Sequence, residues 1–137
     1  MNSLSRVFIL KIAATVVFWC IPLLLFPASV LEIAGLPQQE SYIFIRMLGW
    51  AYLSLCVGYY FGLRASLAKK RSMGIIWVGI VSNSGACAYL FYCGLMGTWS
   101  AWSSIIQFIG WSSAIAAALI TLGLLMYGVK GNEPIAD

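Results

Sequence analysis

The sequence predicts an all-α integral membrane protein, a four-transmembrane-helix bundle in which all 137 residues form a single domain. Apolar residues make up 62% of the chain and charged residues only 9%, whereas a soluble domain has about 25% charged residues. Four apolar stretches reach the roughly 20 residues that a helix needs to cross the hydrocarbon core. These stretches are continuously apolar instead of alternating, which favours helices over the strands of a membrane barrel.

The first predicted helix covers residues 7–27, and Pro22 should bend it by removing one backbone hydrogen bond. Lys11 interrupts its apolar run, and no Ala-x-Ala site follows Pro27, so we expect a retained helix and not a signal peptide. Residues 28–36 are too short to span the membrane and are mildly amphipathic. We expect them to lie along the outer interface.

Three further helices are predicted over residues 42–63, 73–97 and 102–128. The connection between the last two is short, which predicts an antiparallel helical hairpin. Of the eight basic residues, seven fall on one predicted side: Arg6, Lys11, Arg64, Lys69, Lys70, Arg71 and Lys130.

The positive-inside rule then places both termini and the RASLAKKR loop (residues 64–71) in the cytoplasm, with the protein in the inner membrane. The net charge of +4 is thereby explained by topology and does not indicate nucleic acid. The loop is expected to contact anionic membrane lipids; docking of a cytoplasmic protein partner is the alternative.

A six-residue word occurs twice, as IRMLGW at residues 45–50 and as IQFIGW at residues 106–111. On a helix, Arg46, Gly49 and Trp50 of the first copy share a face. Gln107, Gly110 and Trp111 share the corresponding face in the second copy. The match suggests two helical hairpins related as parallel repeats. Chance agreement between apolar segments is the alternative.

Arg46 is a membrane-embedded arginine, which is costly unless it is paired or hydrated. Glu32 and Glu40 are the acidic residues on the same predicted side, and we expect Glu32 to pair with Arg46 because Glu40 lies off its face. Snorkelling of Arg46 to the outer head groups is the alternative.

These polar residues predict an outward-facing ligand pocket with an apolar floor. Its expected lining residues are Arg46, Gln107, Trp50, Tyr89, Tyr92 and Glu32. Such a pocket suits an anionic or carbonyl-bearing amphiphile, for example a lipid phosphate, a fatty acid or a quinone head. Hydrogen bonding between helices is the structural alternative for the same side chains.

Small residues predict where the helices pack, because lipid tails leave close backbone approach as the main source of helix association. The expected packing residues are Gly49, Gly58, Gly62, Asn83 and Gly110. Gly58 and Gly62 form a G-xxx-G pair, which we expect to allow close helix contact within the bundle. A dimer interface is the alternative. Asn83 is expected to fix helix register through an interhelical hydrogen bond; a substrate contact is the alternative.

Residue types typical of catalytic and metal sites are missing from the spans. The chain has no histidine, no acidic residue deep in a span and no C-x-x-C motif among its four cysteines. This disfavours haem, zinc and di-iron sites, carboxylate-based proton coupling and a thiol relay. We therefore expect no metal and no cofactor, and we lean against an enzyme.

The motifs F26-P27, L36-P37 and R46-M47-L48-G49, followed by Tyr59, Tyr60 and a basic loop, resemble the DoxX-like group of small bacterial four-helix membrane proteins. The resemblance covers roughly residues 20–70. It implies that Arg46 and Gly49 are shared positions. Some members of that group are linked to quinone-coupled sulfur oxidation as accessory subunits.

The leading prediction is therefore a non-enzymatic accessory or structural component of a membrane assembly. Such a component would bind a protein partner or form a homo-oligomer. The alternative is a binder or carrier of an anionic or quinone-like amphiphile around Arg46. A third function, a membrane enzyme acting on lipid or quinone, would need a general base that the sequence does not visibly supply.

Overall fold

A computed structural model describes residues 2–36, 38, 40–100 and 102–130, and within these ranges every regular element is a helix. Four continuous helical stretches are long and apolar enough to cross a membrane: Ser3–Leu25, Ile43–Leu67, Met73–Leu95 and Ser104–Val129. The predicted all-α architecture with four candidate membrane spans is confirmed. The elements in chain order are α1 (Ser3–Thr15), the π-helix η1 (Val16–Cys20), α2 (Ile21–Leu25), α3 (Ala28–Ile33), α4 (Ile43–Leu67), α5 (Met73–Leu95), α6 (Ser104–Gly123) and the π-helix η2 (Leu124–Val129).

The first span begins at Ser3, four residues before the predicted start, because Asn2 caps it. The Asn2 side chain accepts a hydrogen bond of 2.8 Å from the Ser5 backbone N–H. The Ser5 hydroxyl lies 2.9 Å from that of Ser66, and both serines are buried. α4 continues to Leu67, beyond the predicted end at residue 63, and Ser66 makes this contact from its last turn.

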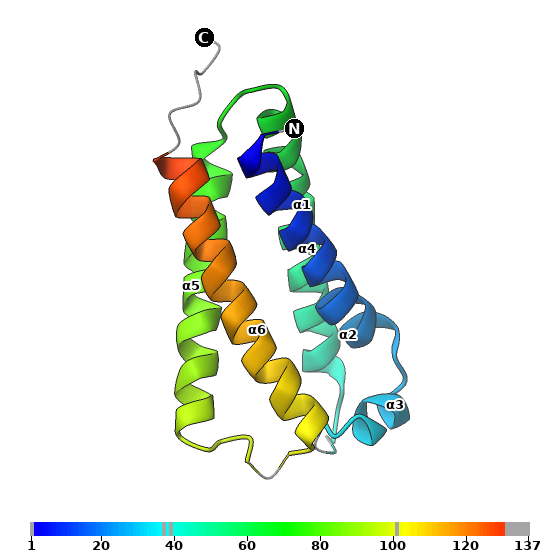
Figure 1. Ribbon diagram of the computed structural model, residues 1–137. Coiled ribbons are helices and arrows are strands. Elements are labelled where there is room, and N and C mark those ends of the chain that lie inside the picture. Colours follow the sequence, from blue (N-terminus) through cyan, green and yellow to red (C-terminus); the bar gives the residue numbers. More distant parts are fainter. Residues whose placement is uncertain (1, 37, 39, 101, 131–137) are drawn as a thin grey trace.

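The predicted irregularity of the first span lies just before Pro22. There the α-helix widens into the π-turn η1, and Pro22 follows within the first turn of α2. Residues 28–36 contain the short helix α3, which lies at one end of the bundle (Figure 1). The Ser103 hydroxyl, at the start of α6, donates a 2.8 Å hydrogen bond to the Ala34 carbonyl. This bond connects the end of α3 to the start of α6.

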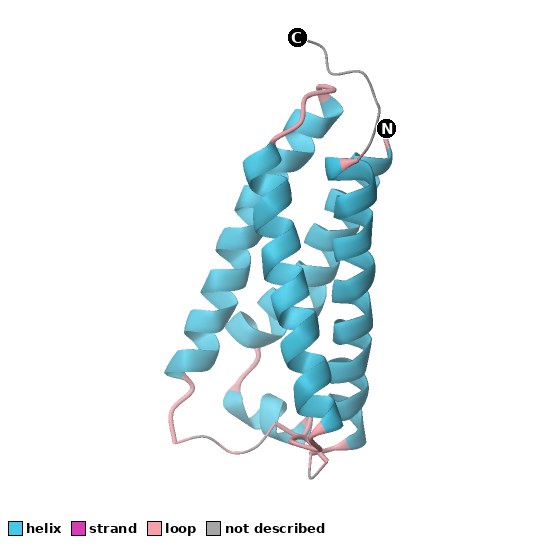
Figure 2. Ribbon diagram, turned by 90° about the vertical axis from the view of Figure 1, so that its left-hand side faces the viewer, coloured by secondary structure: helices cyan, strands magenta, loops and turns pink. Residues whose placement is uncertain are grey.

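The four spans form two helix pairs, shown in Figures 1 and 2. One pair is the hairpin of α5 with α6 and η2, which share the most extensive contact; in the other, α1, η1 and α2 pack against α4. The N-terminus, the α4–α5 loop and the end of η2 lie at one end of the bundle, while α3 and the α5–α6 connection lie at the other (Figure 1).

The hydrophobic core joins the two pairs near the end that holds the N-terminus. Its buried residues come from all four spans: Leu4, Phe8, Tyr59, Ile76, Ile80, Ile120 and Leu124. Gly79 lets α5 approach η2, since a Cβ there would lie 2.7 Å from a methyl carbon of Leu124. This end of the bundle is therefore closely packed.

The predicted packing glycines divide into two groups. A Cβ at Gly49 would lie 2.8 Å from Cγ of Leu24, one at Gly62 would lie 2.8 Å from Cγ2 of Ile75, and one at Gly110 would lie 3.0 Å from the Trp99 ring. Gly49 and Gly62 allow close helix contact, as expected, whereas Gly110 makes room for a tryptophan of the α5–α6 connection. A Cβ at Gly58 would meet no atom within 4 Å, so its expected role in packing this bundle is wrong: Gly58 lies on the outside of α4.

Candidate functional site

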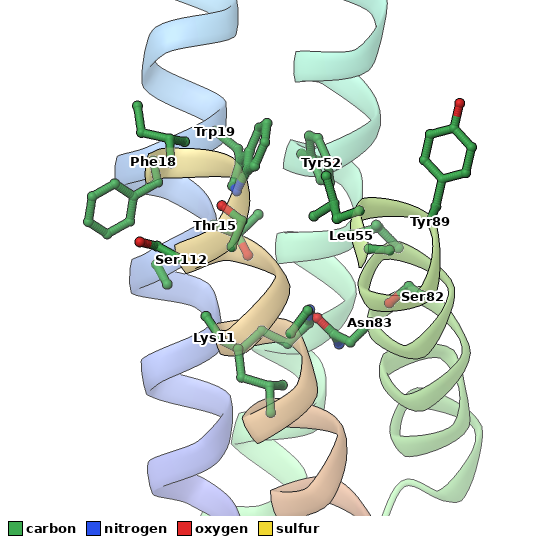
Figure 3. A pocket seen from close by; sticks show the side chains of 18 of the residues that line it. Lys11, Thr15, Phe18, Trp19, Tyr52, Leu55, Ser82, Asn83, Tyr89 and Ser112 are labelled. Atoms are coloured by element: carbon green, nitrogen blue, oxygen red, sulfur yellow. The ribbon is translucent and has the colours of Figure 1, made fainter. Parts of the chain in front are cut away.

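A cavity of about 530 Å³ lies between the two helix pairs (Figure 3). Its size falls within the roughly 300–1,000 Å³ typical of small-molecule sites. Side chains from all four spans line it. The polar or aromatic ones are Lys11, Thr15, Phe18, Trp19, Tyr52, Tyr59, Ser82, Asn83, Tyr89, Phe108, Ser112 and Ser113.

Lys11 and Asn83 form the central polar contact of this cavity. The Lys11 ammonium donates a 2.7 Å hydrogen bond to Oδ1 of Asn83 and lies 4.4 Å from the centre of the Tyr59 ring. Only 6% of the Lys11 surface is exposed. The Asn83 amide nitrogen donates to the Gly79 carbonyl at 2.5 Å, which fixes the amide oxygen toward Lys11. This contact between α1 and α5 is the interhelical hydrogen bond expected of Asn83.

The Tyr59 hydroxyl lies 2.8 Å from the Ser82 hydroxyl. With Lys11 and Asn83, these two side chains form what we call the polar floor of the cavity. Because the Ser82 hydroxyl donates to the Gly79 carbonyl at 3.2 Å, Tyr59 donates to Ser82 in this arrangement. Thr15, one helical turn from Lys11, adds a further hydroxyl to the cavity lining.

Two serines of α6 offer hydroxyl groups to this cavity. Ser112 and Ser113 both line it, and neither side chain hydrogen-bonds another residue of the described ranges. A hydroxyl carries one donor and two acceptor positions. These two groups are available to a bound molecule.

The charge of Lys11 is not balanced by a carboxylate in the spans. The four acidic residues of the chain are Glu32, Glu40, Glu133 and Asp137, and all lie outside the sequence ranges of the four helical stretches. A buried cation without a counter-ion is costly in a membrane interior. The cavity therefore combines one cation with a neutral amide as its partner.

The cavity is open toward the sides of the bundle. Phe18, Tyr89 and Phe108 line it, yet 63%, 69% and 72% of their surfaces are exposed. These rings come from η1, α5 and α6, and Phe18 and Tyr89 lie on opposite sides of the view in Figure 3. Since many exposed side chains of the helices are apolar, these openings would face lipid in a membrane.

Arg46, the centre of the predicted pocket, binds the end of the first span. Its Nη1 donates to the Leu23 carbonyl at 2.6 Å and its Nη2 to the Phe26 carbonyl at 2.5 Å. These carbonyls are free because the last C=O groups of a helix have no partner within the helix.

The expected pairing of Arg46 with Glu32 is wrong. Glu32 instead accepts a 2.6 Å hydrogen bond from the Tyr42 hydroxyl, and the described part of the chain contains no Arg46–Glu32 ion pair. The carbonyls at the end of α2 satisfy Arg46 without an acidic partner.

In the described part of the chain, none of the other predicted pocket residues hydrogen-bonds Arg46. Gln107 donates to the carbonyls of Ser100 (3.2 Å) and Trp102 (3.0 Å) in the α5–α6 connection. Trp50 and Tyr92 are 63% and 59% exposed. Of the six predicted residues, all within the described ranges, only Tyr89 lines the cavity at Lys11.

No protein-family model matches this chain, and no curated protein or solved structure matches it. The resemblance to the DoxX-like group stays a prediction. Among the described residues, no group of three or more His, Cys, Asp or Glu side chains could hold a metal ion.

Sequence reasoning missed Lys11 as a site residue because it lies near the N-terminus and was counted with the topology-setting charges. The packing of α1 against α4 and α6 places it inside the bundle. The rule that singled out Arg46, a charged residue within an apolar run, applies equally to Lys11 in VFILKIAAT. The serines of the cavity carry no comparable signal.

Proposed function

We propose that this multi-pass membrane protein binds or carries a small amphiphile in the cavity between its helix pairs. The ligand's anionic or carbonyl-bearing head would lie at Lys11, and its apolar part would lie along the aromatic walls. The observation that carries the proposal is the Lys11–Asn83 contact: a cation that is 6% exposed, inside a cavity, with a neutral amide as hydrogen-bond partner. The sequence-predicted binding function is thereby moved from Arg46 to Lys11.

The cavity differs from a closed structural contact in the partners that it lacks. Purely structural polar contacts in membranes are normally closed, with each donor and acceptor paired. Here the cation has no carboxylate in the spans, and the Ser112 and Ser113 hydroxyls have no side-chain partner among the described residues. An anionic head group would supply the missing counter-charge at Lys11.

Native mass spectrometry of protein purified in mild detergent tests this function. We expect a co-purified amphiphile on the wild-type protein and its loss from the double variant Lys11→Met/Asn83→Leu. The double variant removes both members of the polar pair, so no orphan polar group remains to unfold the protein. Ser84→Ala is the matched control, because Ser84 is exposed on α5 and does not line the cavity. An adduct retained by the double variant, or none on the wild type, contradicts the proposal.

The predicted role as an accessory component of a membrane assembly is a second candidate. It is favoured by the small residues Ala51, Ser54 and Gly58, which follow one exposed or partly exposed line on α4. Such a strip lets another helix approach closely. Crosslinking in membranes tests it: Gly58→Leu should abolish a stoichiometric partner or dimer. Unchanged crosslinking in that variant contradicts this role.

We also propose that the end holding the N-terminus faces the cytoplasm. With Lys11 inside the bundle, the basic residues at this end are Arg6, Arg64, Lys69, Lys70, Arg71 and Lys130, which still satisfies the positive-inside rule. A topology reporter inserted in the α4–α5 loop should be active on the cytoplasmic side. Reporter activity on the opposite side would reverse the assignment.

A further inference from the structure

We infer that the ligand of this cavity is a single-chain amphiphile with one carboxylate head, a long-chain fatty acid or a close chemical relative, paired with the Lys11 ammonium. The inference rests on the proposed binding function and specifies its ligand class. Three features carry it: the charge of the cavity, its hydrogen-bond donors and its size.

The charge of the cavity selects a single negative charge. Lys11 is the cation that lines it, and the spans contain no acidic residue. In a low-dielectric site the stable arrangement has charges that cancel. A monocarboxylate gives this balance. A neutral head leaves the cation uncompensated, and a phosphate monoester, which carries up to two charges, leaves an excess negative charge.

The donors of the cavity match a group that only accepts hydrogen bonds. An ionised carboxylate has two acceptor oxygens and no donor. The Lys11 ammonium has three N–H groups, of which Asn83 takes one. The hydroxyls of Ser112 and Ser113 can donate as well. The Asn83 amide does not compete, because its oxygen faces Lys11 and its nitrogen donates to Gly79.

The size and walls of the cavity select one chain. A volume of about 530 Å³ suits a single small ligand, whereas a phospholipid with two acyl chains is larger than such sites usually hold. Beyond the polar floor the walls are apolar, with Leu55, Leu90 and Ile109 among the aromatic rings. The exposed rings of Phe18 and Phe108 line an open side through which a long chain can reach the lipid.

Three probes with the same saturated alkyl chain test the inference: palmitate, hexadecanol and hexadecyl phosphate. Each is titrated into delipidated, detergent-purified protein at neutral pH, and bound probe is measured by equilibrium dialysis. We expect palmitate to bind at least about ten-fold more tightly than hexadecanol, the effect of one charge-assisted hydrogen bond. Hexadecyl phosphate should bind more weakly than palmitate. In Lys11→Met/Asn83→Leu the preference for palmitate should disappear, while Lys11→Arg should retain it.

The outcomes separate this inference from the proposed function. Equal binding of palmitate and hexadecanol, or a preference for hexadecyl phosphate, overturns the carboxylate and leaves an amphiphile-binding cavity in place. A palmitate preference that survives the double variant overturns the role of Lys11. If no probe binds, the inference fails; if the wild-type protein also carries no amphiphile from the membrane, the proposed function fails with it.

Discussion

Lys11 and Arg46 are both basic side chains within apolar helices, but they meet different kinds of partner. Arg46 reaches the end of a neighbouring helix and donates to the carbonyls of Leu23 and Phe26. Lys11 lies against helix interiors, where it finds the side chain of Asn83, the ring of Tyr59 and a cavity. The comparison separates a cation bound to backbone carbonyls at a helix end from one that lies in a cavity with a neutral side-chain partner.

The difference has a general physical cause. The last carbonyls of any helix lack partners, so a helix end presents acceptors without any special sequence. In a helix interior the backbone is already hydrogen-bonded, and a cation there depends on other side chains or on a bound group. Arg46 is therefore satisfied by the chain itself, whereas the charge of Lys11 is not balanced within the spans.

The largest effect is expected for Arg46→Ala, which leaves the Leu23 and Phe26 carbonyls without their donor. Two hydrogen bonds to a charged group, reduced by the partial exposure of Arg46, predict a loss of about 3 kcal/mol in the free energy of unfolding. Denaturation in detergent micelles measures it, and Arg46→Lys should recover part of the loss. A fully stable Arg46→Ala protein that no longer binds palmitate would reverse the two roles.

The next largest effect is the difference in stability between two variants at the Lys11 site. Lys11→Met alone leaves the Asn83 amide oxygen buried without a donor, so this variant should be less stable than Lys11→Met/Asn83→Leu by about 1–3 kcal/mol. The same denaturation assay measures the difference. Equal stability of the two variants would show that Asn83 does not depend on Lys11.

Gly49→Ala tests whether close helix contact holds the Arg46 region together. The new Cβ would lie 2.8 Å from Cγ of Leu24 and 3.1 Å from Cβ of Leu23, next to the carbonyl that Arg46 binds. We expect a loss of about 1–2 kcal/mol in stability from overpacking. Gly58→Ala on the same helix is the control, because its Cβ meets open space; it should not lower stability, since alanine favours a helix over glycine by about 0.5–1 kcal/mol. Similar losses in both variants would contradict the difference in packing.

The smallest effect is expected for Ser113→Ala, which removes one hydroxyl from the cavity. Palmitate affinity should fall by about threefold to tenfold, the value of one ordinary hydrogen bond, with stability unchanged. Equilibrium dialysis measures the affinity. Ser84→Ala, outside the cavity, should leave it unaltered, and an equal decrease in both variants would exclude a direct contact from Ser113.

The repeated six-residue word shows how far local pattern predicts a role. In both copies the polar residue donates to backbone carbonyls earlier in the chain, Arg46 to the end of α2 and Gln107 to the α5–α6 connection, and the glycine lies in a close contact. The tryptophans differ: Trp50 is 63% exposed, whereas the ring of Trp111 lies 5.9 Å from that of Trp99. The pattern predicted close packing, but it could not predict which side chains would converge. The two-hairpin repeat itself stays a prediction.

The sequence by itself determined the helical class and the four candidate spans, because both depend on local sums of apolar residues over lengths of about 20. It also indicated that a polar residue within an apolar run must find a partner. Only the tertiary structure decided which partner, since Lys11 on α1 and Asn83 on α5 are 72 positions apart in the chain and meet only when the two helix pairs come together. Hydropathy is additive along the sequence, whereas a cavity and its hydrogen bonds exist only where separate helices come together.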